Sequence, residues 1–178
     1  YFTVTMKWIA VVLMCSIVDL ASVNCKCDLG TGIDYDPKQV EGDWYVDYSS
    51  PSIFEQMSKI RIKFKLEDQT YNSTLTITFK NETTPREFDS TWEINDNKDL
   101  QVKVPELSTF NGVYRLIAAE DKQYIIFRGC QDSSNGEPLI FIETAEQCPD
   151  EDMLKKAVEN MDPPMDCSDF TKDPEVHC

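Results

Sequence analysis

The sequence predicts an all-β protein: an eight-stranded up-and-down antiparallel barrel with one C-terminal α-helix packed outside. Between residues 42 and 146, short runs of alternating apolar and polar residues are separated by turn-forming residues, which is typical of an antiparallel meander. The runs number eight, and an even meander with a continuous apolar inner face can close on itself and remove its edges. One amphipathic stretch, residues 149–161, follows them. A two-sheet sandwich is the alternative architecture.

The first 22 residues are expected to be upstream sequence followed by a secretory signal. A lysine after Met6 precedes an apolar run, residues 8–18, which is shorter than the roughly 20 residues needed to cross a bilayer. We therefore expect export, removal of the signal after Ser22 and no membrane anchor, with cleavage after Cys25 as the competing site. Residues 23–41 then form an N-terminal segment before the barrel.

Cysteine usage agrees with an exported protein. Seven cysteines are present, and removal of Cys15 with the signal leaves an even six, as expected for disulfides in an oxidising compartment. These six are Cys25, Cys27, Cys130, Cys148, Cys167 and Cys178. Their placement predicts that both termini are stapled to the barrel. Many pairings fit this count; the one we favour joins the N-terminal cysteines to Cys130 and Cys178, and Cys148 to Cys167.

Charged residues indicate which face of each strand points outward. In residues 60–66, three basic residues alternate with Ile60, Ile62, Phe64 and Leu66, and the same period of two assigns an inner face to the later runs. The breaks between runs are rich in the residues that hairpin connections require. They are residues 67–69, 81–85, 95–97, 105–112, 120–122 and 131–136.

The last two strands, residues 123–129 and 137–144, are apolar on both faces, so another element must cover their outer side. Residues 149–161 provide it as a helix, because a proline and three acidic residues suit a helix start. The apolar stripe of this helix consists of Met153, Leu154, Ala157, Val158 and Met161. The tail, residues 162–178, is expected to be tethered by its cysteines.

Charge and histidine content exclude several functions. A net charge of -15 makes nucleic acid and anionic membranes poor partners and is typical of a highly soluble protein. The single histidine, His177, lies in the tail, so a catalytic or zinc site would lack a second imidazole. We expect a one-domain monomer with no enzymatic activity, no metal and no cofactor.

Gly42-Asp43-Trp44 opens the eight-run meander, and in this combination the chain resembles the lipocalin family. Within that family it is most similar to cockroach lipocalins, namely the milk proteins of viviparous cockroaches and a related allergen. The residues that carry this are 50–58, 124–129 and 148–152. The resemblance implies that Gly42 and Trp44 close one end of the barrel. Two motifs depart from the family: Ala119-Glu120-Asp121 replaces Thr-Asp-Tyr, and Ala145 replaces an arginine.

Members of this family bind fatty acids, pheromones, biogenic amines or pigments, so the resemblance implies a ligand cavity inside the barrel. The inner-face residues expected to line it are Val46, Tyr48, Ile62, Phe64, Ile77, Phe79, Phe88, Trp92, Val102, Tyr114, Leu116, Ile125, Phe127 and Ile140. Such a pocket is apolar and aromatic, with two tyrosines as polar groups, and it suits an acyl chain. An amine would need an inward carboxylate, and the alternation places none there.

The expected function is that of a secreted lipocalin holding a small apolar, fatty-acid-like ligand, in a glycosylated milk or nutrient protein. One alternative is a pheromone, odorant or salivary carrier. A second is a pure storage protein with no ligand. Expression in a brood sac would favour nutrition, and expression in antenna, saliva or male gland would favour a carrier.

We predict N-glycans at Asn72 and Asn81, because both lie in Asn-x-Thr sequons on surfaces that the period of two leaves exposed. Treatment of the secreted protein with an amidase that removes N-glycans should lower its mass. The Asn72→Gln and Asn81→Gln variants should each lose one glycan. No mass shift would contradict either the outward assignment of these residues or export.

Overall fold

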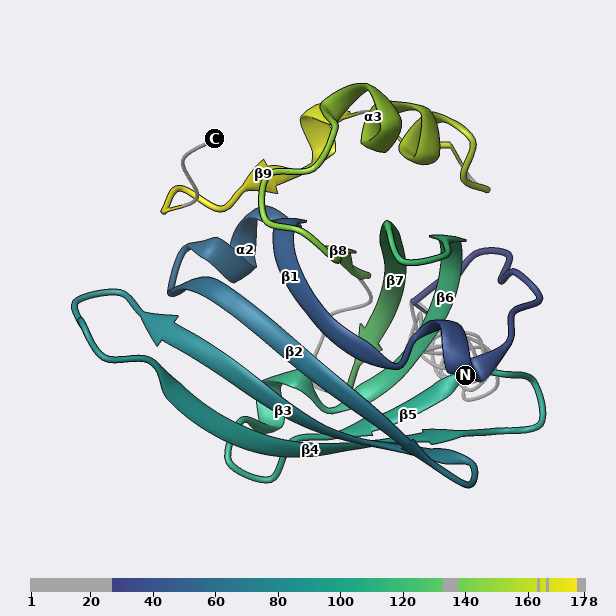
Figure 1. Cartoon of the computed structure of the whole chain (residues 1–178), viewed down its shortest axis with the longest axis horizontal. Coiled ribbons are helices and arrows are strands. Elements are labelled where there is room, and N and C mark those ends of the chain that lie inside the picture. The colour runs from purple at the N-terminus through teal and green to yellow at the C-terminus, as the bar shows by residue number, and fades with distance from the viewer. Residues whose placement is uncertain (1–26, 133–137, 163, 166, 176–178) are drawn as a thin grey trace, which may run out of the picture.

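The computed structural model describes residues 27–132, 138–162, 164–165 and 167–175. Eight strands form a closed antiparallel barrel with order β2-β3-β4-β5-β6-β7-β8-β1, closed by pairing of β1 with β2 (Figure 1). They are β1 (Gly42–Ser49), β2 (Met57–Glu67), β3 (Thr70–Phe79), β4 (Arg86–Ile94), β5 (Leu100–Lys103), β6 (Gly112–Glu120), β7 (Tyr124–Gln131) and β8 (Leu139–Thr144). The predicted fold class is therefore confirmed.

The structure also contains four short helical elements that were not predicted from the sequence. They are the 3-10 helices η1 (Pro37–Gln39), η2 (Ser108–Phe110) and η3 (Cys167–Asp169), and the one-turn helix α2 (Pro51–Phe54). A ninth strand, β9 (Thr171–Lys172), also pairs with β1, at Tyr48 and Ser49. The pairing of β1 with β2 stops at Tyr45. Beyond that residue, β9 takes the place of β2 along the same edge of β1.

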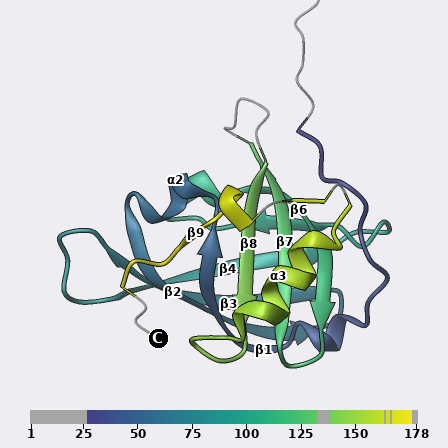
Figure 2. The same ribbon diagram turned by 90° about the horizontal axis from the view of Figure 1, so that it is seen from above.

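The C-terminal helix α3 (Glu151–Glu159) lies over the outer face of β6, β7 and β8 (Figure 2). It is shorter than expected because the Asp150 side chain accepts hydrogen bonds from the backbone N–H groups of Asp152 and Met153, as an N-cap does. Leu154, Ala157, Val158 and Met161 pack on the outward isoleucines of the three strands, which are Ile117, Ile126, Ile140 and Ile142. This contact covers the strands that are apolar on both faces.

The N-terminal segment closes one end of the barrel. Trp44 is buried and donates its indole N–H to the carbonyl of Val40 at 2.8 Å, and Tyr71 donates to the carbonyl of Pro37 at 2.7 Å. Arg115 forms two hydrogen bonds to the Asp99 carboxylate, at 2.6 and 2.9 Å, and a third to the Gly30 carbonyl. The segment is thus fixed to β1, β3 and β6 by buried or partly buried polar contacts.

A disulfide joins Cys27 to Cys130, as predicted for one N-terminal cysteine. Cys148 is also disulfide-bonded, to a cysteine outside the described side chains. The pairings expected for Cys25, Cys167 and Cys178 likewise fall outside the described side chains, and the signal, its cleavage site and His177 lie outside the described residues.

We predict that the double variant Cys27→Ser/Cys130→Ser unfolds more easily than the wild-type protein. The bond spans a sequence separation of 103, and losing so long a loop closure lowers the free energy of unfolding by about 2–5 kcal/mol. Urea unfolding followed by circular dichroism measures this. A midpoint equal to that of the wild-type protein would show that this link contributes nothing to stability.

Candidate functional site

Aromatic side chains fill the middle of the barrel. Phe64 contacts Trp92 edge to face at 5.0 Å between ring centroids, and Trp92 lies 5.5 Å from both Tyr114 and Phe127. Phe141 continues the group 6.1 Å from Tyr114. Gly129, opposite Tyr114 in the β6–β7 ladder, leaves space for this ring, since a Cβ at Gly129 would meet it.

Between these rings lies a small apolar void of about 20 Å³. Its lining residues are Ile60, Ile62, Leu75, Trp92, Val102, Val104, Phe110, Tyr114, Phe141 and Glu143. Two of its polar groups are satisfied by the protein: the Trp92 indole N–H donates to Ser90 Oγ at 3.0 Å, and the Tyr114 hydroxyl donates to the Phe110 carbonyl at 3.0 Å. The void has room for about one water molecule.

Glu143 also lines the void, but it differs from Trp92 and Tyr114 in having no polar partner for its side chain among the described residues. Its side chain is fully buried, and neither carboxylate oxygen has a hydrogen-bond partner among the described residues. Its ladder neighbours are Val46 on β1 and Ile125 on β7, both part of the interior cluster. Burial without a charged or polar partner raises the pKa of this carboxyl well above its ordinary value.

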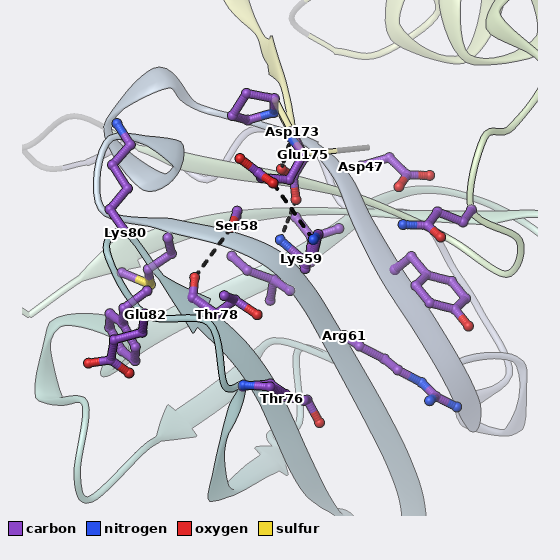
Figure 3. Close-up of a pocket in the computed structure, with 18 of the residues that line it drawn as sticks. Asp47, Ser58, Lys59, Arg61, Thr76, Thr78, Lys80, Glu82, Asp173 and Glu175 are labelled. Carbon is purple, nitrogen blue, oxygen red and sulfur yellow. Dashed lines mark hydrogen bonds and ion pairs between the residues drawn. The ribbon is translucent and has the colours of Figure 1, made fainter. Parts of the chain in front are cut away.

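A second, larger cavity lies outside this core, where β1 and β2 separate (Figure 3). This cleft, of about 630 Å³, is bounded by the C-terminal segment, in which Asp173 accepts a hydrogen bond from the Lys59 backbone and Glu175 pairs with the Lys59 ammonium at 3.7 Å. Ile60 lines both the cleft and the void. The cleft and the void beside Glu143 therefore adjoin each other at Ile60.

Asp47 ties the strands together at this cleft. One of its carboxylate oxygens accepts a hydrogen bond from Thr144 Oγ1 at 2.6 Å, and its backbone carbonyl accepts from the N–H of Asp173 at 2.9 Å. Burial, opposed by the hydrogen bond from Thr144, raises the pKa of this carboxyl. Asp47 thereby links β1 to β8 and to the C-terminal segment.

Two residues expected to face the cavity lie outside it. Tyr48 packs with α3 because β1 carries a bulge between Val46 and Tyr48, which reverses the face of every residue beyond it. Ile140 also faces α3, while Leu139 and Phe141 face inward. The remaining expected lining residues lie in the interior cluster or, like Phe79, pack against it.

The expectation that no carboxylate faces inward was wrong, because Glu143 does. Charged residues mark the outer face of the other strands, whereas β8 is buried on both faces and lacks this alternation. A signal existed in the sequence: once Phe141 is set inward, the period of two also sets Glu143 inward. Arg115 and Asp99, which hold the closed end, were also missed.

The predicted glycosylation residues are exposed. Asn72 lies on β3 and donates its side-chain amide to Glu67 at 2.9 Å, and Asn81 lies in the turn after β3 with a φ of 72°. Asparagine tolerates this left-handed conformation better than most residues. Asn81 also borders the cleft between β1 and β2.

Within the described ranges, no cluster of three or more histidine, cysteine or acidic side chains could hold a metal ion. In that same part of the chain, no helix is long and apolar enough to cross a membrane.

A closed eight-stranded barrel with a tryptophan at its closed end and one helix packed outside is the lipocalin fold. Comparison with solved structures agrees. Lobster apocrustacyanin A1 superposes with a TM-score of 0.63 at 15% identity, over 77% of this chain and 78% of that one. The cockroach allergen Per a 4 gives 0.60 at 17% identity, over 83% and 94%. A biogenic amine-binding protein gives 0.62 at 10% identity, over 83% and 86%.

At these identities the likeness extends to the fold. No protein-family model matches the sequence, and a search of curated proteins finds no match.

We predict that Glu143→Gln stabilises the ligand-free protein at neutral pH and has little effect near pH 4. The raised pKa keeps the Glu143 carboxyl protonated in the folded state at pH values where the unfolded chain ionises it, so unfolding releases a proton and rising pH favours unfolding. Each pH unit between the unfolded and folded pKa values then removes about 1.4 kcal/mol of wild-type stability. Glutamine does not titrate and escapes this loss.

Thermal unfolding of both proteins between pH 4 and pH 8 measures the difference, with the exposed residue changed in Glu87→Gln as the control. The melting temperatures of wild-type and Glu143→Gln proteins should diverge as the pH rises. Parallel curves would mean that Glu143 has a partner in solution.

Proposed function

We propose that the protein is a secreted carrier that holds one small ligand with an apolar body inside its barrel. The observation that carries the proposal is Glu143, a buried ionisable group that faces an aromatic void and has no partner among the described residues. Burial of an unpaired carboxyl costs several kcal/mol, and a plain packed core would place an apolar residue there. A ligand that supplies the missing partner gives this residue a use.

Secretion is supported by the Cys27–Cys130 disulfide, because such bonds persist in oxidising compartments. The solved structures with this fold include a protein whose name states that it binds biogenic amines. A carrier also gives a use to the cleft that adjoins the void at Ile60, since a ligand must be able to reach the interior.

The size of the void argues against the long-chain fatty acid expected from the sequence. Sites for drug-sized ligands enclose about 300 Å³ or more, whereas the void beside Glu143 encloses about 20 Å³. A compact ligand needs fewer interior side chains to move than an extended acyl chain does. We therefore place a compact apolar ligand ahead of a fatty acid.

The second candidate is the nutrient or storage role, and the nearly filled interior favours it. A protein whose value lies in its amino acids and glycans needs no cavity, and both sequons are exposed. The two functions differ in one measurable respect: a carrier binds a ligand in its interior with a defined stoichiometry.

We predict that a neutral fluorescent probe, N-phenyl-1-naphthylamine, binds in the interior and that changes at Leu75 alter its affinity in opposite directions. Leu75 lines the void, so Leu75→Ala enlarges it and should strengthen binding several-fold, whereas Leu75→Phe fills it and should weaken binding. Lys63→Ala, an exposed position on β2, is the matched control and should leave affinity unchanged. Fluorescence titration measures the affinities, and circular dichroism confirms folding.

Organic extraction of the native secreted protein followed by mass spectrometry completes the test. About one small molecule per protein supports the carrier. No extracted ligand, together with probe binding that is weak and equal in all four folded proteins, supports storage alone.

A further inference from the structure

We propose that the ligand is a small primary amine with an aromatic or similarly apolar body, whose ammonium group pairs with the Glu143 carboxylate inside the barrel. This inference rests on the proposed carrier function and adds the chemical class of the ligand and the residue that selects it.

The first argument is the state of the carboxyl group. Glu143 is fully buried, both of its oxygens lack partners among the described residues, and the adjacent residues on β1 and β7 are Val46 and Ile125. The protein thus supplies this carboxylate with no cation and no hydrogen-bond donor. A bound ammonium has three donors and one positive charge, and so compensates the carboxylate more fully than a neutral donor does.

The second argument is the aromatic lining. Trp92, Tyr114 and Phe141 share the void with Glu143, and the Tyr114 ring centroid lies 5.5 Å from that of Trp92 and 6.1 Å from that of Phe141. Ring faces attract cations, most strongly where water is excluded, and the same rings provide apolar contact for the body of the ligand. Carboxylate and rings together therefore favour a cation attached to an apolar group.

The third argument is the charge of the whole protein. A net charge of -15 raises the local concentration of cations and lowers that of anions. A ligand with its own carboxylate is repelled by this field. The electrostatics of the chain and of the site favour the same sign of ligand.

The route to the site runs through the cleft between β1 and β2. Ile60 lines both the cleft and the void, and it follows Lys59, whose backbone is left-handed with a φ of 49° within an irregularity of the β2–β3 ladder. Asp47, Asp173 and Glu175 line the cleft on its β1 and C-terminal sides (Figure 3). The cleft also carries the basic residues Lys59, Arg61 and Lys80, so the selection of an amine rests on Glu143 and not on the charge of the route.

Binding of an amine in this way is coupled to proton release. Burial raises the pKa of the ligand-free carboxyl well above its ordinary value, so this group keeps its proton to a higher pH than an exposed glutamate does, and pairing with the ammonium favours its ionised form. Tyr114 is the other titratable residue lining the void; burial raises its pKa too, so it stays neutral. One proton should therefore leave for each amine bound, and affinity should increase with pH.

The test uses three probes with one body and different head groups: 2-phenylethylamine, 2-phenylethanol and phenylacetate. Isothermal titration calorimetry at pH 7 in two buffers of different ionisation enthalpy gives both affinity and proton release. The wild-type protein should bind the amine at least about 10-fold more tightly than the alcohol, release about one proton per amine and bind phenylacetate least. These outcomes follow from the pairing of a buried carboxylate with an ammonium.

Glu143→Gln keeps the size of the side chain but removes its charge. It should lose the preference for the amine and the proton release while it still binds the alcohol, and the exposed control Glu87→Gln should match the wild-type protein. Equal affinities for amine and alcohol, unaffected by Glu143→Gln, would overturn the amine site and leave the carrier function intact.

Ile60→Ala covers the case in which the wild-type interior is too tightly closed. This change joins the void to the cleft, so amine affinity should rise, and the double variant Ile60→Ala/Glu143→Gln should lose that gain. If folded Ile60→Ala protein binds none of the three probes, the carrier function and the amine site both fall.

Discussion

The structure depends on how β1 is shared between neighbours. This strand pairs with β8 along one edge, with β2 along the first half of its other edge and with β9 along the second half. Because every backbone group of a closed barrel must find a partner, the separation of β1 from β2 has to be compensated, and the C-terminal segment does so. The bulge at Asp47 adapts β1 to this change of partner, turns Tyr48 towards α3 and frees the Asp47 carboxylate to accept from Thr144. The cleft is a direct consequence, since it occupies the gap that the two strands leave.

Much of this architecture could be predicted from local patterns. Alternation with charged residues as markers placed Ile62, Phe64 and Trp92 inward, and turn residues located the hairpins, because both signals act within a few residues of the chain. The prediction that Tyr48 faces inward was wrong because a bulge depends on the pairing of strands that are distant in sequence. The local alternation of apolar and polar residues does not reveal such a bulge. The inward assignment of Ile140 was wrong, and Glu143 was not predicted, because β8 is buried on both faces and the period of two alone does not tell which face is inner. The partly buried Arg115–Asp99 pair was not predicted for a similar reason, since it depends on β6, the residue before β5 and the N-terminal segment coming together.

The same features explain why the interior is neither an open cavity nor an ordinary core. Five aromatic rings in mutual contact leave a void of about 20 Å³, so the packing is close to that of any protein interior. Yet Ile60, which lines both the void and the cleft, lies in an irregular stretch of β2. A rotamer change of Ile60 breaks no hydrogen bond, whereas widening the barrel elsewhere breaks hydrogen bonds between paired strands. Side-chain movement that opens the interior is therefore easiest on the side of the barrel where β1 and β2 separate.

Thermodynamics separates a carrier from a storage protein at Glu143. A storage protein needs only to fold. An unpaired buried carboxyl lowers its free energy of unfolding without any functional benefit, so leucine or glutamine at this position would make it more stable. A carrier gains stability from its ligand in proportion to the logarithm of ligand concentration over the dissociation constant. In such a protein the unfavourable burial of Glu143 is present only without ligand, and it makes binding more selective because the site favours ligands that offset it. In a carrier, therefore, the residue that lowers the stability of the empty barrel also increases the selectivity of binding.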